Sequence, residues 1–173
     1  MRLSPIMLSM KAICIYSGDR RIPARTRKIN ERLRKEGCVS EIEELHDFLD
    51  IRYLWPISSV FMRKGRLSRS YLSFLRTFCL KHAFRALVTN LQEESSDIIF
   101  ASDCQSAIIM TDLMKKAELH IPVILFSSDD RLEALSGMVK TEIKSVKDIE
   151  QSRNGTILIA RDPDVIPNLI SPL

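Results

Sequence analysis

The chain has 173 residues, of which 26 are Lys or Arg and 22 are Asp or Glu, giving a formal net charge of +4, and 45% are hydrophobic. This length suits one domain, and the composition is that of an ordinary globular protein, which excludes a largely disordered chain. The mild positive charge suits attraction to phosphates or to an anionic surface. It does not require nucleic acid, and we expect no nucleic-acid partner.

The cysteines and the first residues bear on location. Cys14, Cys38, Cys79 and Cys104 share no metal-ligand spacing, so we expect reduced thiols in a cytoplasmic protein. Residues 1–10 are too short and too weakly apolar for a secretory signal, and no apolar run is long enough to span a membrane. We treat residues 1–10 as an extension, with Met10 as an alternative start, and residues 11–173 as a single domain.

The first part of the chain predicts a βαβ unit. Residues 12–16 (AICIY) read as a buried strand that ends in a polar turn. Residues 25–36 carry an amphipathic helix pattern that Gly37 ends, and residues 39–45 read as a weaker second strand. Strand, helix and strand over some thirty residues indicate a parallel pair with a right-handed crossover.

The middle of the chain is less regular. Residues 50–65 hold the only tryptophan, and either a short strand or an irregular connection fits them. Residues 68–91 show apolar side chains at helical spacing, which predicts a long helix.

The second half alternates strands and helices. Strands are predicted at residues 97–101 (DIIFA), 122–126 (PVILF) and 156–160 (TILIA), and helices at 106–117 and 130–138. Unbroken apolar strands separated by amphipathic helices are typical of a parallel sheet that is covered on both faces. We therefore expect an α/β fold, a single three-layer Rossmann-like domain with a mostly parallel sheet.

Three polar loops follow the predicted strands, at residues 17–23, 102–106 and 127–131. Ligands of open α/β sheets bind at the carboxyl ends of the strands. If Tyr16, Ala101 and Phe126 end neighbouring parallel strands, these loops share one edge of the sheet. This edge is where we expect the functional site.

The first loop is a candidate phosphate site, formed by Gly18, Asp19, Arg20 and Arg25. Gly18 allows a tight turn, and the helix that follows offers free amides to an anion. The loop has one glycine, so it is neither a Walker loop nor the three-glycine dinucleotide fingerprint, and we expect no cofactor. The alternative is a solvated turn with exposed arginines.

The other two loops supply carboxylates. Asp103 is the candidate catalytic residue, because it could accept hydrogen bonds from sugar hydroxyls or act as a base, with Ser102 beside it in the same site. The alternative is that Ser102 or Asp103 caps the next helix. Asp129 is a further candidate binding residue; a helix cap is favoured over a metal site there, and we expect no metal.

Basic residues gather in two parts of the sequence. They cluster in residues 20–35 and 63–85, and with Trp55 and Phe61 nearby the second cluster could rest on an anionic membrane surface; a solvated face is the alternative.

The three histidines share no ligand spacing, so we expect them to be structural or exposed: His46, His82 and His120.

Three stretches together resemble the N-terminal domain of the glycosyltransferases with the two-domain GT-B architecture, in particular the retaining family 4-like group. They are KAICIYSGDRRIPARTRKINERLRKEGCVSEI, SSDIIFASDCQSAIIMTDLMKKAELHIPVILFSSDD and VIPNLISPL. In the second stretch Phe100 and Ser102 stand where the family has histidines, and Asp103 matches the acidic position. In the third, Leu169 and Ile170 replace the usual Gly-Val.

The resemblance implies the acceptor-side half of a glycosyl-transfer site. In this family a second domain makes most contacts to the nucleotide sugar, so we expect a separate donor-binding partner chain. A lipid-linked acceptor would suit the basic surface, and the protein would then be peripheral on the membrane. Two alternatives stay open, a non-catalytic binding or scaffold module of the same fold and an unrelated Rossmann-like enzyme that binds a nucleotide through the Gly18 loop.

Overall fold

The computed structural model describes residues 10–18, 21–63, 66–79, 89, 91, 96–127 and 135–170. Within these ranges six parallel strands form one sheet, in the spatial order β2 (Val39–Glu44), β1 (Lys11–Tyr16), β5 (Ile98–Ala101), β6 (Val123–Phe126), β8 (Ile157–Ala160) and β7 (Lys140–Glu142). A separate antiparallel pair is formed by β3 (Met62–Arg63) and β4 (Arg66–Leu67).

The helical segments lie between the strands and after β8. They are α1 (Ala24–Lys35), α2 (Leu45–Phe48), the 3-10 turn η1 (Arg52–Leu54), α3 (Trp55–Phe61), α4 (Arg69–Phe74), the π-helical segment η2 (Leu75–Cys79), α6 (Cys104–Lys116), α7 (Val146–Glu150), the 3-10 turn η4 (Pro163–Val165) and α8 (Ile166–Ile170).

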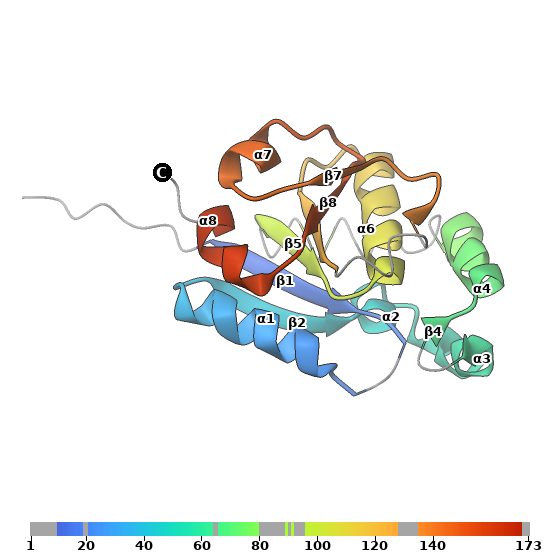
Figure 1. Ribbon diagram of the computed structural model, residues 1–173. Helices are drawn as coiled ribbons and strands as arrows, with labels where there is room; N and C mark the ends of the chain where they lie inside the picture. Colours follow the sequence, from blue (N-terminus) through green and yellow to red (C-terminus); the bar gives the residue numbers. More distant parts are fainter. Residues whose placement is uncertain are drawn as a thin grey trace, which may run out of the picture.

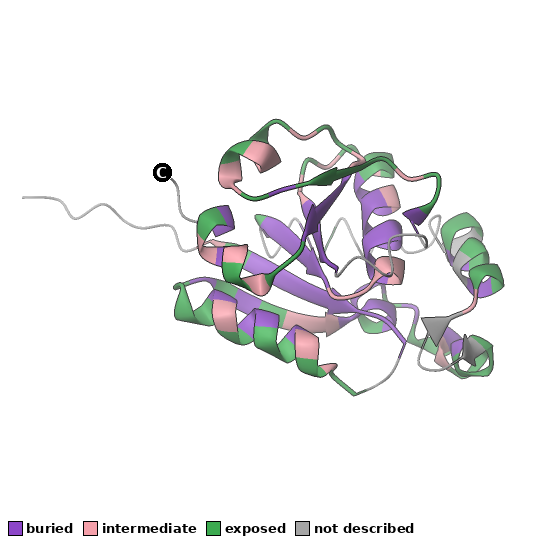
Figure 2. Cartoon of the chain, in the orientation of Figure 1, coloured by how far each residue is buried: buried purple, intermediate pink, exposed green. Residues whose placement is uncertain are grey.

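The core consists of two apolar layers, one on each face of the sheet. In β1, Ile13 and Ile15 pack with α2, α4 and α6 on one face, while Ala12 and Cys14 pack with α1 and α8 on the other. The same alternation runs through β5, β6 and β8. Side chains of a strand alternate between faces, so four consecutive apolar residues serve both layers. Figure 1 shows the helices on either side of the sheet, and Figure 2 shows the buried strands between them.

Helix α1 illustrates how the sequence sets an element's limits. Pro23 precedes it with a φ of −60°, and Ile29 and Leu33 are fully buried on its inner side. The helix ends where Gly37 takes a φ of +84°, which allows the Cys38 amide to donate to the Leu33 carbonyl at 3.1 Å. The chain then enters β2, beside β1.

The order of the strands creates a switch point between β1 and β5. The chain leaves β1 through α1 to reach β2 on one side, and it leaves β5 through α6 to reach β6 on the other side. These two helices cover opposite faces of the sheet. Ligands of such folds bind at the carboxyl ends of the strands where the connections diverge, so the fold places the candidate site at the ends of β1 and β5.

The α/β prediction is confirmed. The strands expected at residues 12–16, 97–101, 122–126 and 156–160 are present within one residue, and so is β2. Tyr16, Ala101 and Phe126 end the neighbouring parallel strands β1, β5 and β6.

Other expectations need correction. Residues 50–65 were expected to hold a short strand or an irregular connection, but most of them are helical, in η1 and α3, and among those described only β3 is a short strand. Pro56 lies in the first turn of α3, where a missing amide hydrogen costs nothing. The described part of the predicted helix 68–91 is α4 followed by η2, and its remainder lies largely outside the described residues, as does most of the predicted helix 130–138. The strand β7 went unpredicted because none of its three residues is buried.

Among the described residues, no helix has both the length and the apolar character required to cross a membrane.

Candidate functional site

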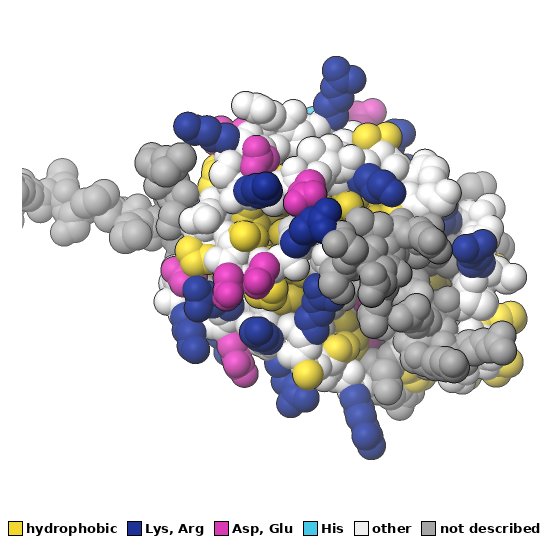
Figure 3. Space-filling view, viewed as in Figure 1, with side chains coloured by type: hydrophobic (Ala, Val, Ile, Leu, Met, Phe, Trp, Pro, Cys, Tyr) yellow, Lys and Arg dark blue, Asp and Glu magenta, His cyan; other side chains and the backbone are white. Residues whose placement is uncertain are grey.

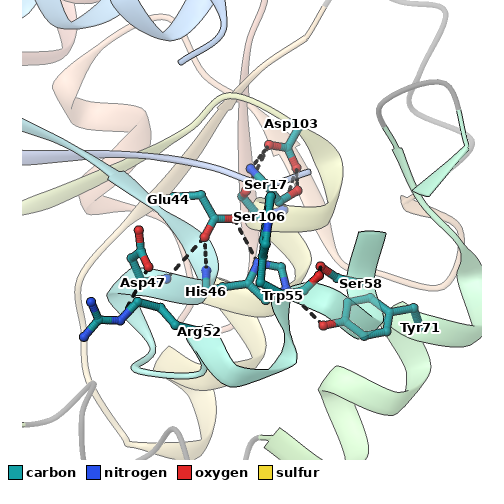
Figure 4. A network of polar contacts seen from close by, with 10 residues as sticks. All are labelled: Ser17, Glu44, His46, Asp47, Arg52, Trp55, Ser58, Tyr71, Asp103 and Ser106. Carbon is teal, nitrogen blue, oxygen red and sulfur yellow. Dashed lines mark hydrogen bonds and ion pairs between the residues drawn. The ribbon is translucent and has the colours of Figure 1, made fainter. Parts of the chain in front are cut away.

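The ends of β1 and β5 are joined by Asp103. The Ser17 amide donates to Oδ2 of Asp103 at 2.8 Å, and the Ser17 hydroxyl donates to Oδ1 at 2.8 Å. On its other side, the same carboxylate accepts from the Ser106 amide at 2.8 Å and from the Ser106 hydroxyl at 3.0 Å. Figure 4 shows Asp103 between the two serines. We call this arrangement the Ser17–Asp103 latch.

The latch defines what Asp103 does. Its side chain caps α6, which was the alternative expected from the sequence. Burial raises the pKa of the Asp103 carboxyl, while the hydrogen bonds from Ser106 and Ser17 act against that rise. Each carboxylate oxygen accepts one amide and one hydroxyl, which fills its two lone pairs. This geometry favours a positioning role over that of a general base.

Ser102 ties a third element to the same edge. Its amide donates to the Ile15 carbonyl at 2.9 Å, and its hydroxyl accepts from the Thr26 hydroxyl in α1 at 2.7 Å. Gly18 follows Ser17 with a φ of +109°, a conformation that glycine tolerates and most residues do not. The first turn of α1 is therefore held against the loops that follow β1 and β5.

The structure brings Gly18, Ser102 and Asp103 together as predicted, with Arg25 in the first turn of α1. Three other predicted residues lie outside the described residues: Asp19, Arg20 and Asp129.

A pocket of about 320 Å³ opens beside the latch, at the carboxyl ends of β1 and β2. The described residues around it are Tyr16, Glu44, His46, Asp47, Arg52 and Trp55. Tyr16 and Glu44 pair in register as the last residues of their strands. The pocket thus combines charged groups with aromatic walls at the edge where ligands of this fold bind.

A buried polar chain forms one wall of the pocket. Glu44 caps α2 by accepting from the His46 amide at 2.7 Å and the Asp47 amide at 3.2 Å, and its other oxygen lies 2.9 Å from His46 Nδ1. His46 Nε2 lies 3.0 Å from the Tyr71 hydroxyl. An ionised carboxylate only accepts, so Nδ1 carries a hydrogen, and in the neutral ring the Tyr71 hydroxyl donates to Nε2. We call this set the Glu44–His46–Tyr71 chain.

Aromatic rings surround this chain. The Trp55 ring meets the His46 ring edge-on, with centroids 5.1 Å apart and planes at 83°. Tyr71 stacks on both Phe61 and Phe74, at centroid distances of 5.8 and 6.1 Å. These contacts hold α3 and α4 against the pocket wall. Figure 4 shows Trp55 and Tyr71 beside His46.

The mouth of the pocket is charged. Arg52 lies 3.6 Å from Asp47 and 3.8 Å from Asp50, and all three side chains are more than half exposed. Such exposed pairs contribute little to stability, and they remain accessible to a polar ligand.

Sequence reasoning missed His46 as a site residue. It was expected to be structural or exposed, and it is indeed buried with two side-chain partners, but it also lines the pocket. The available signal was its place two residues after β2. The strand-end rule, applied to the second predicted strand as well as to the first, third and fourth, selects Glu44 and His46.

A second pocket, of about 300 Å³, lies at the opposite edge, where residues 120–123 and 152–156 lead into β6 and β8. It sits at the amino ends of the strands, away from the switch point, and is therefore a weaker candidate than the pocket at the carboxyl edge.

Comparison with known proteins finds a likeness in structure but none in sequence. No protein-family profile matches the chain, and no curated protein matches it in sequence. Among solved structures it is similar to the glycosyltransferase SnogD from Streptomyces nogalater, with a TM-score of 0.43 and 12% sequence identity over 88% of this chain. The chain spans 44% of the length of that protein.

Proposed function

We propose that the chain is a glycosyltransferase-like domain that supplies the acceptor-side half of a glycosyl-transfer site and works with a separate donor-binding domain. The pocket beside the Ser17–Asp103 latch holds the saccharide part of the acceptor. The proposal is supported by the pocket's place and lining, and by the three sequence stretches that resemble GT-B N-terminal domains.

The lining of the pocket is the observation that carries the proposal. Sugars are recognised by planar charged groups that bind pairs of hydroxyls and by aromatic rings that pack on the sugar's apolar face. The exposed Arg52–Asp47 pair offers the first, and Trp55 offers the second. A volume of about 320 Å³ is at the small end of ligand pockets and suits one or two sugar rings.

The latch has a defined task in this scheme. Asp103 fixes the loop after β1, so that Gly18 and the first turn of α1 keep one geometry. In the proposed complex this loop, with Arg25, faces the diphosphate of a donor held by the partner domain. Fixed amides and cations that stabilise a departing diphosphate are the main requirement of such a transfer.

Saccharide binding tests the proposal directly. The full chain is titrated with a panel of mono- and disaccharides and followed by saturation-transfer NMR. We expect binding by the wild type, a loss of at least about tenfold in Trp55→Ala and in Arg52→Gln, and no change in the controls Tyr53→Ala and Arg27→Gln. Tyr53 is 65% exposed and Arg27 is exposed on α1, and neither lines the pocket.

Two outcomes contradict the proposal. One is the absence of binding to any saccharide by a folded wild-type chain. The other is an equal loss of binding in the pocket variants and in their controls, which would place the sugar elsewhere. Circular dichroism of each variant separates loss of binding from loss of fold.

A second candidate is a non-catalytic binding module of the same fold. It is favoured by one observation: among the described residues, the two groups best placed to act as a base are already engaged. The lone pairs of Asp103 are filled, and both ring nitrogens of His46 have partners. Mass spectrometry distinguishes the transferase half-site from the non-catalytic module. A saccharide acceptor is incubated with a nucleotide sugar, the chain and its co-purified partner, and only a transferase half-site yields a heavier acceptor.

A further inference from the structure

We propose that the outer face of α3, together with η1 and the exposed residues of α4, docks onto an anionic lipid surface. Five large apolar side chains there are exposed. They are Tyr53 at 65%, Ile57 at 46%, Val60 at 79%, Phe61 at 42% and Phe74 at 38%. We call this set the α3 patch. Figure 3 shows hydrophobic side chains at this end of the molecule.

The orientation of α3 is opposite to that of an ordinary surface helix. Ile57, Val60 and Phe61 recur at intervals of three and four residues and so share one face, which is turned to solvent. The helix instead buries Ser58, whose hydroxyl donates to the Trp55 carbonyl at 2.8 Å. An apolar stripe facing outward, with a satisfied serine facing inward, is the arrangement expected of a helix that meets a second apolar phase.

The charge around the patch selects the kind of surface. In the sequence, residues 51–92 contain no Asp or Glu and eight basic residues, which are Arg52, Arg63, Lys64, Arg66, Arg69, Arg76, Lys81 and Arg85. Two of them are paired with carboxylates from outside this segment, Arg52 with Asp47 and Asp50 and Arg76 with Asp112. Arg69 is exposed at the start of α4, and Arg63 and Arg66 stand in the short strands that directly follow α3. Exposed apolar side chains beside Arg69, in a segment whose own sequence carries only basic charges, fit anionic lipid headgroups over acyl chains. A nucleic acid would match the basic charge and the aromatic rings, but not the aliphatic side chains of Ile57 and Val60, which favour acyl chains.

The patch is held firmly by the fold. Tyr71, which is 2% exposed, stacks on Phe61 and Phe74, and it is tied through His46 to the end of β2. Docking would therefore not require the helix to refold. Because Trp55 both begins α3 and lines the pocket, a docked patch places the pocket mouth near the headgroups. If the pocket binds an acceptor saccharide, this position suits a lipid-linked acceptor, and that part of the inference rests on the proposed function. The docking of the α3 patch onto lipid does not depend on the proposed function.

Co-sedimentation with vesicles tests the docking. We use vesicles of phosphatidylcholine alone and vesicles with 30% phosphatidylglycerol (roughly the anionic content that gives a strong surface potential). The full chain is expected to bind the anionic vesicles and to be released as salt rises. Val60→Asp should weaken binding by about tenfold or more, because it places a charge in the apolar contact. Arg69→Glu should weaken it by at least about fivefold, the effect of one basic residue near the surface.

Each variant has a matched control. Val139→Asp changes a valine that is 66% exposed next to β7, and Arg27→Glu changes an exposed arginine on α1. Both controls should bind vesicles as the wild type does. Equal losses in variants and controls would overturn the α3 patch, as would equal binding to both vesicle types or no binding to either. Sedimentation velocity without lipid tests self-association. If the wild type forms dimers and Val60→Asp does not, the lipid-docking proposal is overturned in favour of self-association.

The result is independent of the saccharide titration. Vesicle binding without saccharide binding would retain the docking surface and remove the proposed function. Saccharide binding without vesicle binding would retain the function and remove the surface.

Discussion

Ser17 and Asp103 are 86 residues apart in sequence, yet the amide and the hydroxyl of the serine both donate to that one carboxylate. The contact bridges the switch point between the two central strands. It makes the geometry of the candidate site depend on a residue that also caps a helix. Changes at Asp103 should therefore affect stability and binding together.

Replacing Asp103 with Asn should destabilise the fold by about 2–3 kcal/mol, because an amide NH₂ would face donors that now have acceptors. Urea unfolding followed by circular dichroism measures the difference. Asp164→Asn is the control, since Asp164 is exposed and no side-chain contact is seen for it in the described residues, and it should change the unfolding free energy by less than about 0.5 kcal/mol. An equal effect of the two substitutions would contradict the latch.

The pH dependence of Asp103 has a definite sign. Burial raises the pKa of this carboxyl in the folded chain, so the folded state holds its proton more tightly than the unfolded state does. The stability that Asp103 contributes is then largest below the ordinary carboxyl pKa and falls as pH rises towards the raised pKa. The unfolding free energy of the wild type minus that of Asp103→Asn should decline from acid to neutral pH. A rise over this interval would show that the hydrogen bonds outweigh burial.

Tyr71→Phe isolates the far end of the Glu44–His46–Tyr71 chain. The change removes only the hydroxyl that meets His46 Nε2, so the fully buried ring nitrogen loses its partner. We expect a loss of about 1–2 kcal/mol in unfolding free energy, measured by urea titration. Tyr53→Phe makes the same change at a ring that is 65% exposed and should have no measurable effect.

Much of this site could be predicted, and the reasons are local. Unbroken apolar runs such as residues 98–101 and 123–126, separated by amphipathic helices, are typical of strands buried on both faces, so the parallel sheet and the shared edge of its loops followed from the sequence. The cap at Asp103 was foreseen because a Ser or Asp after a buried strand commonly begins a helix. The second partner of Asp103, Ser17, depends on which strands are neighbours.

Other features could not be predicted because they depend on distant contacts. His46 acquires its role from Tyr71 and Trp55, residues 25 and 9 positions away, and no spacing in the sequence links them. The strand β7 has the sequence Lys-Thr-Glu and is exposed throughout, so it carries neither an apolar run nor alternation. The strand β7 forms because its backbone pairs in parallel with that of β8.

Cys14 should be inert in the folded chain. It is fully buried in β1, and burial raises the pKa of its thiol to about 12. At pH 8 the thiolate, which is the reactive form, is then scarcer by roughly a thousandfold than in an exposed cysteine. Alkylation with iodoacetamide, followed by peptide mass spectrometry, should leave Cys14 unmodified in buffer and modify it in urea. Rapid native modification of Cys14 would contradict its place in the core.

Phe100, in β5, belongs to the apolar core. Its ring stacks on Phe126 with centroids 5.5 Å apart, in the layer beneath α1 and α8. Phe100→Ala should cost about 3–5 kcal/mol in unfolding free energy, while Phe100→Leu, which nearly conserves volume, should cost less than about 1.5 kcal/mol. Similar losses in both variants would show that ring stacking, rather than volume, matters most.

The position of β8 has a consequence for how the sheet is assembled. β8 lies between β6 and β7, although it is the last strand in the chain, and it is the strand with which β7 pairs. During synthesis on the ribosome, β7 emerges before β8, the strand with which it pairs. Until β8 is synthesised, the backbone groups along one edge of β6 have no strand partner. A nascent chain that stops before residue 157 therefore cannot complete the sheet. The sheet is completed only when β8 has been synthesised, because the apolar residues of this strand contact both layers of the core.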